Sequence, residues 1–400
     1  MDRGLICSVT QVPEDDAVTV SRRSFIQVAG AGAVGSLFVP WVSGRGLEAM
    51  TLDPFTGTPE QSRLTDAIRL NSNENPNGPG PIALGAITAA LGEANRYPRG
   101  SVTSLRDAVA KSFGLAADNV VLGCGSSDIL RACVYAFTGP NRPLVTSQPS
   151  YESPPADARR VGANVIEVPV TGDLKLDLDA MAIAARGAGL VYLCNPNNPT
   201  STVHGAEAVK RFVARVMQDS PSTTILIDEA YHEYVDDPSY VTALPLAIEN
   251  PRVVIARTFS KVYGLAGMRI GYALADPRTI ATLAPHTLSL GVNQLAAAAA
   301  IAGLEARAHI EQERGLNRAA RTYTLRALAD AGFPAADSQA NFLMVNLHRD
   351  AQPFRDACKR DGVLVGRPFP PLDTYVRISI GTMDEMRQGM DVFRRVLATT

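Results

Sequence analysis

The sequence of 400 residues predicts an α/β fold with a mainly parallel sheet, and three observations support this. Short apolar runs alternate with helical stretches between residues 118 and 300, which is typical of parallel βαβ units. Several of these runs end in polar residues or in turns of Gly, Pro and Asn, as strands do at the ligand-binding edge of an open sheet. The composition, 46% hydrophobic and 20% charged, is that of a soluble globular protein.

The individual elements can be placed in chain order. Helices are expected at residues 82–93 and 102–113, and a third helix follows the turn Gly123-Cys-Gly-Ser-Ser-Asp128 and ends at Phe137. Strands are expected at residues 119–122, 144–147, 164–168, 190–194, 224–227 and 253–256. The Ala-rich stretch 293–330 predicts one or two long helices, and two further strands are expected at 341–347 and 375–380. We therefore expect an N-terminal arm that joins the small domain (45–95), a large domain (96–300) and a smaller C-terminal α/β domain (301–400).

The N-terminus has the pattern of an export signal. Ser21-Arg22-Arg23-Ser24 is a twin-arginine sequence, and a short apolar run at residues 28–39 follows it. We expect residues 1–44 to direct export to the periplasm or the extracellular space. The alternatives are an amphipathic helix of the folded domain, which the glycines and the absence of a polar face disfavour, and an unused signal, which leaves the protein in the cytoplasm. Cleavage and retention as an anchor both stay open.

Charge and cysteine usage exclude other classes of function. The net charge of −2 and the absence of a basic stripe disfavour nucleic-acid binding. The five cysteines include no C-x-x-C pair, so neither a zinc site nor a dense disulfide framework is predicted, and we expect no metal.

Lys261 is the first candidate for a catalytic residue. It follows the buried strand at 253–256 directly after Thr258-Phe-Ser260, which places it at the carboxyl end of a strand. A partly desolvated lysine near other cations has a lowered pKa and can form a Schiff base with a carbonyl group. The alternative, a solvated surface lysine, is the common state of a single lysine.

Other strand ends supply groups that suit a phosphate. The glycine turn Gly123-Cys-Gly-Ser-Ser opens a helix, so the backbone N–H groups and the hydroxyls of Ser126 and Ser127 can face an anion. Thr258, Ser260 and Arg269 add hydroxyls and a fixed positive charge.

The remaining strand ends suit an aromatic ring. Asp228 ends the apolar run Ile-Leu-Ile, where a carboxylate needs a cationic partner such as a protonated pyridine nitrogen. Tyr231 can reach the same ring, Tyr151 can stack on it, and Asn198 can donate a hydrogen bond to a ring oxygen. With Lys261, these groups point to pyridoxal 5′-phosphate, with Lys261, Asp228 and Tyr231 as catalytic residues.

The chain resembles the fold-type I aminotransferases of class I/II, most closely the histidinol-phosphate aminotransferase branch. The resemblance extends from about residue 70 to 381 and rests on these segments: Leu70-Asn-Ser-Asn-Glu-Asn-Pro76, Asn95-Arg-Tyr-Pro98, Pro149-Ser-Tyr151, Asn195-Pro-Asn-Asn-Pro-Thr200, Ile227-Asp-Glu-Ala-Tyr231, Thr258-Phe-Ser-Lys261, Gly267-Met-Arg269, Gln339-Ala-Asn-Phe342 and Val376-Arg-Ile-Ser-Ile-Gly-Thr382. It implies a mainly parallel seven-stranded sheet between helices and a smaller C-terminal α/β domain. The activity it implies is transfer of an amino group between an amino acid, or an amine like histidinol phosphate, and a 2-oxo acid.

The resemblance also implies roles for residues far from Lys261. It implies a homodimer in which Tyr97 reaches the cofactor phosphate of the neighbouring subunit, and Arg377 as the ligand of the substrate's anionic group. Asn73 belongs to the arm that closes over the substrate, and Asn341 belongs to a matching motif. The sequence departs from the branch at Val365-Gly-Arg-Pro-Phe369, which moves Arg367 towards the distal group of the substrate.

Three rival functions are weighed against the transaminase. A decarboxylase, racemase or β-lyase can use the same cofactor on the same fold. An exported binding or maturation factor without activity is the second, although Lys261 and Asp228 are both present. A nicotinamide-binding Rossmann protein is the third, and the sequence lacks the G-x-G-x-x-G motif with an acidic residue downstream.

Overall fold

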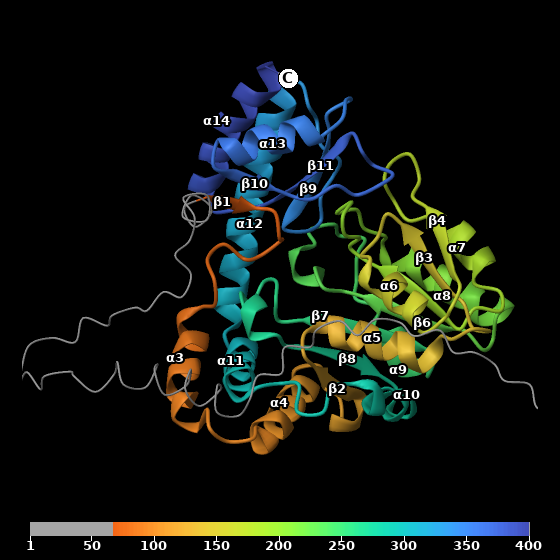
Figure 1. Ribbon diagram of the computed structural model, residues 1–400. Coiled ribbons are helices and arrows are strands. Elements are labelled where there is room, and N and C mark those ends of the chain that lie inside the picture. Colours follow the sequence, from red (N-terminus) through yellow and green to blue (C-terminus); the bar gives the residue numbers. More distant parts are fainter. Residues whose placement is uncertain (1–66, 400) are drawn as a thin grey trace, which may run out of the picture. The chain divides into compact units, whose positions relative to one another are not determined.

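The computed structural model describes residues 67–399. The predicted export signal at residues 1–44 and most of the predicted arm lie outside the described residues. A seven-stranded sheet of order β2-β8-β7-β6-β5-β3-β4 lies between helices, as expected from the sequence (Figure 1). Its strands are β2 (Val120–Gly123), β3 (Leu144–Gln148), β4 (Val165–Pro169), β5 (Leu190–Cys194), β6 (Thr224–Asp228), β7 (Val253–Thr258) and β8 (Gly271–Ala275).

Strand β8 is the antiparallel member of this sheet. It pairs antiparallel with β2 and β7, whereas the other neighbouring strands pair parallel. The mainly parallel α/β fold is therefore confirmed. The sequence did not predict β8, because its residues Gly-Tyr-Ala-Leu-Ala include no β-branched side chain, whereas Gly and Ala are uncommon in strands. Its first residue, Gly271, also follows a loop rich in glycine.

The two faces of the sheet are covered by different helices. Along β6, Ile225 and Ile227 contribute to one core and Leu226 to the other, because successive side chains of a strand point to opposite faces. The first core includes side chains of α4 (Arg99–Ser112), α7 (Leu178–Ala184), α8 (Ala206–Asp219), α9 (Leu244–Glu249) and α11 (Gln294–Glu305). The second includes side chains of α5 (Ser126–Phe137), α6 (Ser153–Arg160) and α10 (Pro277–Leu283). The alternation puts Asp228, two residues after Leu226, on the side of α5.

The C-terminal part of the chain builds a third core of its own. Two short sheets contribute to it: β9 (Phe342–Asn346) pairs antiparallel with β11 (Tyr375–Ser379), and β1 (Ile68–Leu70) pairs parallel with β10 (Val363–Val365). Helices α12 (Arg307–Asp330), α13 (Gln352–Arg360) and α14 (Met383–Thr399) cover them. Figure 1 shows β1, the first described strand, beside the much later β10. The sequence predicted neither β1 nor β10 as a strand, since each is only three residues long.

Helix boundaries differ modestly from those expected. Helix α3 (Pro81–Ala90) continues into a short 3-10 helix, η2 (Leu91–Glu93), and α4 begins at Arg99 instead of residue 102. The stretch 293–330 forms two helices, since the backbone leaves the helical conformation at Ala306, with φ −82° and ψ 48°. The other 3-10 helices among the described residues are η3 (Ala117–Asn119), η4 (His232–Tyr234), η5 (Ala266–Met268) and η6 (Ala284–His286). The domain boundaries drawn at residues 95 and 300 stay predictions.

Candidate active site

A cavity of about 330 Å³ lies at the carboxyl ends of the parallel strands and collects most of the predicted site residues. It is lined by polar side chains from β6 and β7, from the start of α5, from the loop after β1 and from the C-terminal core. The predicted site residues among its lining are Asn73, Ser126, Ser127, Tyr151, Asn198, Asp228, Tyr231, Thr258, Ser260, Lys261, Arg269, Arg367 and Arg377.

Lys261 reaches the centre of this cavity from the end of β7. Its Nζ donates a hydrogen bond of 3.0 Å to the backbone carbonyl of Asn73 and lies 5.4 Å from the centroid of the Tyr231 ring. Burial, and then the positive charge of Arg377, lowers the pKa of Lys261 to about 8. A lysine in this state supplies a neutral, nucleophilic amine near neutral pH.

Asp228 lies at the end of β6 and is 3% exposed. Its Oδ2 accepts a hydrogen bond of 2.9 Å from the Tyr192 hydroxyl, and its Oδ1 accepts one of 3.1 Å from the backbone N–H of Ala230. Burial raises the pKa of Asp228 to about 6, although both hydrogen bonds act in the opposite direction. No arginine or lysine forms an ion pair with Asp228 within residues 67–399, so this buried carboxylate is suited to a cationic ligand.

The start of α5 and Arg269 form a compact polar cup. Gly125 has a φ of +75°, and a Cβ at this position would lie 2.3 Å from Nη2 of Arg269. The backbone conformation therefore requires glycine here, and a Cβ would also displace the Arg269 guanidinium from the cup. Nη2 of Arg269 donates to the Ser127 hydroxyl at 3.2 Å, and Nη1 lies 3.5 Å from the Ser260 hydroxyl. The Thr258 hydroxyl donates to the Ser260 hydroxyl at 2.9 Å, which holds these two hydroxyls together in the cup.

Arg377 approaches the cavity from β11. Its Nη1 donates to Oδ1 of Asn198 at 2.8 Å, and its Nη2 donates to the backbone carbonyl of Asn71 at 2.7 Å. Burial lowers the pKa of Arg377 to about 10. Its Nε is buried and has no hydrogen-bond partner among the described residues. The guanidinium group is thus held by two neutral acceptors and keeps its positive charge available to an anion.

Asn73 links Lys261 to the C-terminal core. It adopts a left-handed conformation, with φ 54°, and its backbone N–H donates to the Ser379 hydroxyl at 2.8 Å. Its Nδ2 donates to the Tyr231 hydroxyl at 3.2 Å. Nδ2 of Asn341 donates to the same Asn73 carbonyl that accepts from Lys261, at 3.1 Å. Tyr231, Lys261 and Asn73 are therefore held in one hydrogen-bonded group.

Two of the predicted site residues do not line this cavity. Tyr97 is 80% exposed, in the segment between η2 and α4. Asn341 lines a separate cavity of about 100 Å³, and its Nδ2 contacts the Asn73 carbonyl.

Tyr192 and Glu152 are among the residues at the cavity that were not anticipated as part of the site. Tyr192 carries the hydroxyl that contacts Asp228, and its position on β5, two residues before Cys194, was the available signal. Glu152 lines the cavity directly after Tyr151. Residues 67–399 contain no group of three or more His, Cys, Asp or Glu side chains that could hold a metal ion.

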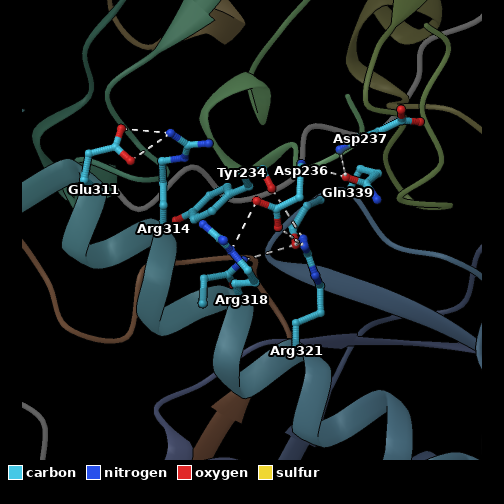
Figure 2. A network of polar contacts seen from close by, with 10 residues as sticks. Tyr234, Asp236, Asp237, Glu311, Arg314, Arg318, Arg321 and Gln339 are labelled. Carbon is cyan, nitrogen blue, oxygen red and sulfur yellow. Dashed lines mark hydrogen bonds and ion pairs between the residues drawn. The ribbon is translucent and has the colours of Figure 1, made fainter. Parts of the chain in front are cut away.

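A polar network connects α12 to the loop that contains Asp236 and to the loop that contains Gln339, as Figure 2 shows. Arg321 is buried, and it donates to Oδ2 of Asp236 at 2.6 Å and to the backbone carbonyl of Ala340 at 3.0 Å. Arg318 contacts the other oxygen of Asp236 at 3.2 Å. Oε1 of Gln339 accepts from the backbone N–H groups of Asp236 and Asp237 at 2.8 and 3.0 Å. The loop that follows Tyr231 is thereby joined to the loop that precedes Asn341.

Comparison with known proteins identifies the family. Residues 65–393 match the family model described as aminotransferase class I and II. The chain belongs to the class I and II aminotransferases. This aminotransferase is 38% identical to a histidinol-phosphate aminotransferase of Symbiobacterium thermophilum, over 84% of this chain and 91% of the relative. It is 34% identical to an aromatic amino acid aminotransferase of Streptomyces avermitilis, over 85% of this chain and 92% of the relative.

A solved structure shows the same similarity. The histidinol-phosphate aminotransferase of Sinorhizobium meliloti in complex with pyridoxal 5′-phosphate has a TM-score of 0.80 and 28% identity, and the match covers 89% of this aminotransferase and 99% of that chain. The activity of this aminotransferase is amino-group transfer, and its cofactor is pyridoxal 5′-phosphate.

The residues of the cavity fit that cofactor. The cup of serine and threonine hydroxyls with Arg269 suits its phosphate, since charged donors bind phosphate oxygens strongly. Asp228, buried without a cationic partner among the described side chains, suits the ring nitrogen, and Lys261 suits the aldehyde carbon. In the aminotransferase, these three groups approach a single cavity from β6, β7 and α5.

Proposed function

We propose that the amino donor of this aminotransferase is an α-amino acid whose carboxylate is bound by Arg377. The observation that carries the proposal is the state of this side chain: it is 8% exposed, lines the cavity and has no acidic partner within residues 67–399. A buried guanidinium held by neutral acceptors favours an anionic ligand, and its planar fork matches the two oxygens of a carboxylate.

The protein groups around the donor have distinct tasks. When bound, pyridoxal phosphate supplies an electron sink that makes the donor's Cα–H bond acidic. Lys261 Nζ is the group that takes and returns this proton, since its lowered pKa of about 8 suits proton transfer near neutral pH. Asp228 keeps the ring nitrogen protonated. Tyr231 and Asn73 orient the lysine, through the ring contact at 5.4 Å and the hydrogen bond at 3.0 Å.

The donor can be identified by half-reactions with single amino donors. We expect an α-amino acid, tested with aromatic amino acids first, to abolish the visible absorbance of the bound cofactor without an acceptor present. Lys261→Ala should abolish turnover, and Arg377→Leu should raise KM for the donor much more than it lowers kcat. Equal KM values for the wild-type and Arg377→Leu proteins would refute the assignment of Arg377. Release of CO₂ from the donor, or its racemisation, would instead indicate another reaction on the same cofactor.

We also propose that the protein is a homodimer in which Tyr97 completes the site of the neighbouring subunit. Tyr97 is 80% exposed and does not line the cavity of its own chain. Other apolar side chains near it in sequence are exposed as well, namely Ile82, Leu84 and Leu91, at 49–56%. An exposed group of large apolar side chains is typical of an interaction surface.

Mixing two inactive variants tests the role of Tyr97. Consider a heterodimer of one Lys261→Ala subunit and one Tyr97→Ala subunit. If Tyr97 acts across the interface, one active site carries both substitutions and the other carries neither, so activity returns. A Tyr97 that acts within its own subunit leaves one defect in each site, and activity stays lost. Sedimentation of the wild-type protein measures the dimer independently.

We propose, finally, that the twin-arginine sequence exports the folded enzyme. The support is the sequence of residues 21–39, which lies outside the described residues. Among residues 67–399, no helix is long and apolar enough to cross a membrane. Replacing Arg22 and Arg23 by lysine should leave the protein in the cytoplasmic fraction, with unchanged specific activity. Equal amounts of the wild-type protein and of the lysine variant in the periplasm would refute the export route.

A further inference from the structure

An ion pair joins two side chains that line the cavity. Glu152 occupies the N-cap position of α6, and Arg367 lies two residues after β10. Oε1 of Glu152 forms an ion pair with Nη2 of Arg367, and both side chains line the cavity. The two side chains are 58% and 49% exposed, so either of them can exchange its partner for a ligand.

Arg367, one member of this pair, lies near Arg377, because both guanidinium groups contact the Phe369 ring. The Arg367 guanidinium lies 4.2 Å from the centroid of the Phe369 ring, and that of Arg377 lies 4.8 Å from it. The pKa of Arg377 is lowered first by burial and also by the charge of Arg367, while the charge of Glu152 raises it. Glu152 therefore lies close enough to influence the group that binds the substrate's anion.

The charges at this end can be counted. Two guanidinium groups and one carboxylate leave one net positive charge at Arg367, Arg377 and Glu152. Asp228, Lys261 and Arg269 are used by the cofactor. The last charged lining residue, Glu74, acts on Lys261, whose pKa it raises. A carboxylate brings one negative charge to this end, whereas a phosphomonoester brings about −1.5 to −2. The single net positive charge at this end therefore balances the single negative charge of a carboxylate.

We propose that Glu152 determines substrate specificity by pairing with Arg367, so that the anion-binding end of the cavity accepts a single carboxylate and disfavours a phosphomonoester. This inference rests on the proposed function, in which Arg377 binds the anionic group of the donor. It names the substrate class more narrowly: a donor with an α-carboxylate and no second anionic charge near Arg367. Without the Glu152 carboxylate, Arg367 is free to bind a second negative charge.

Two unreactive ligands that differ in the anionic group test this in the holoenzyme. The ligands are 3-phenylpropionate and 2-phenylethylphosphonate, and calorimetry gives Kd for each at a pH where the phosphonate is dianionic. Glu152→Gln should tighten phosphonate binding about fivefold relative to carboxylate binding, the effect of one partly solvated charge. Arg367→Gln should shift the ratio of the two Kd values in the opposite direction. Glu167→Gln, which breaks the exposed ion pair of Glu167 with Arg159, serves as the matched control.

The possible outcomes separate the two proposals. A ratio of Kd values that is the same in the wild-type, Glu152→Gln and Arg367→Gln proteins overturns the role of Glu152. If Arg377→Leu leaves the Kd of 3-phenylpropionate unchanged, the assignment of Arg377 fails instead, whatever Glu152 does. The visible absorbance of the bound cofactor confirms in each variant that the site is intact. A Glu152→Gln protein that loses the cofactor shows that Glu152 supports the site structurally, which also overturns the proposal.

Discussion

The hydroxyl of Tyr192 donates a hydrogen bond of 2.9 Å to Oδ2 of Asp228, and both side chains are almost completely buried. The two residues lie on neighbouring parallel strands, β5 and β6, and on the same face of the sheet. A hydrogen bond to the charged form of a carboxylate lowers its pKa. Tyr192 therefore helps to keep Asp228 ionised against the effect of burial.

Replacing Tyr192 by phenylalanine should raise the pKa of Asp228 above its value of about 6. A larger fraction of the carboxyl group is then neutral at pH 7 and cannot pair with the cofactor's ring nitrogen. We expect weaker binding of pyridoxal phosphate and a lower kcat, and both losses should diminish as the pH is raised. Titrations of cofactor affinity against pH for both proteins check this, and a loss that does not depend on pH would contradict it.

The pH dependence of cofactor binding should report on Lys261. Because only the neutral amine is nucleophilic, the rate at which the apoenzyme combines with pyridoxal phosphate should rise through pH 8, the pKa of Lys261 being about 8. Arg377→Leu removes a positive charge that lowers this pKa, so the midpoint should move to higher pH. Stopped-flow absorbance measures the rate. Arg367→Gln is the control, and an unchanged midpoint in Arg377→Leu would contradict the prediction.

The ion pair between Glu229 and Arg257 should be important for stability. The two side chains are 1% and 5% exposed, and Nη2 of Arg257 lies 2.7 Å from Oε2 of Glu229. Arg257→Met leaves a buried carboxylate without its cation and should lower the free energy of unfolding by about 3–5 kcal/mol. Denaturant unfolding measures this change.

A double variant shows whether the lost partner is the cause. Arg257→Met combined with Glu229→Gln should be more stable than Arg257→Met alone, since no unpaired charge remains buried. Arg159→Met, which breaks an ion pair whose arginine is 55% exposed, should change stability by less than about 1 kcal/mol. A double variant that is no more stable than Arg257→Met would contradict this explanation.

Arg321 should stabilise the loops around the site. Arg321→Met removes the donor to the Ala340 carbonyl and one partner of Asp236, and we expect a loss of about 2 kcal/mol. KM for the donor should rise as well, because Asn341, which follows Ala340, holds the backbone of Asn73. Arg321→Lys should recover part of both effects, and Glu311→Gln, at an exposed ion pair of the same helix (Figure 2), should show neither. If the Arg321→Met protein has the KM of the wild-type protein, Arg321 contributes to stability but not to donor binding.

Much of the fold follows from local patterns. The strands β2 to β7 were predicted within about one or two residues, because their apolar runs are bounded by turns, whereas β8 and the short β1 and β10 were missed. The cofactor was predicted because Asp228 ends one apolar run and Lys261 lies shortly after another, and such strand ends meet at one edge of a parallel sheet. Arg377 and Asn73 entered through the family resemblance, since no local pattern connects them to Lys261.

The sequence by itself determined the parallel α/β sheet, the aminotransferase family and the strand ends that meet at the cofactor. The sheet and the strand ends depend on the spacing of apolar and polar residues along the chain, which is a local property. The family followed from a resemblance in short motifs such as Thr258-Phe-Ser-Lys261. Only the tertiary structure decided that Tyr192 contacts Asp228, that Asn73 bonds to Lys261 and that Glu152 pairs with Arg367. Each of these contacts joins residues 36 to 215 positions apart, as 228 − 192 and 367 − 152 show, so it depends on how separate elements pack together.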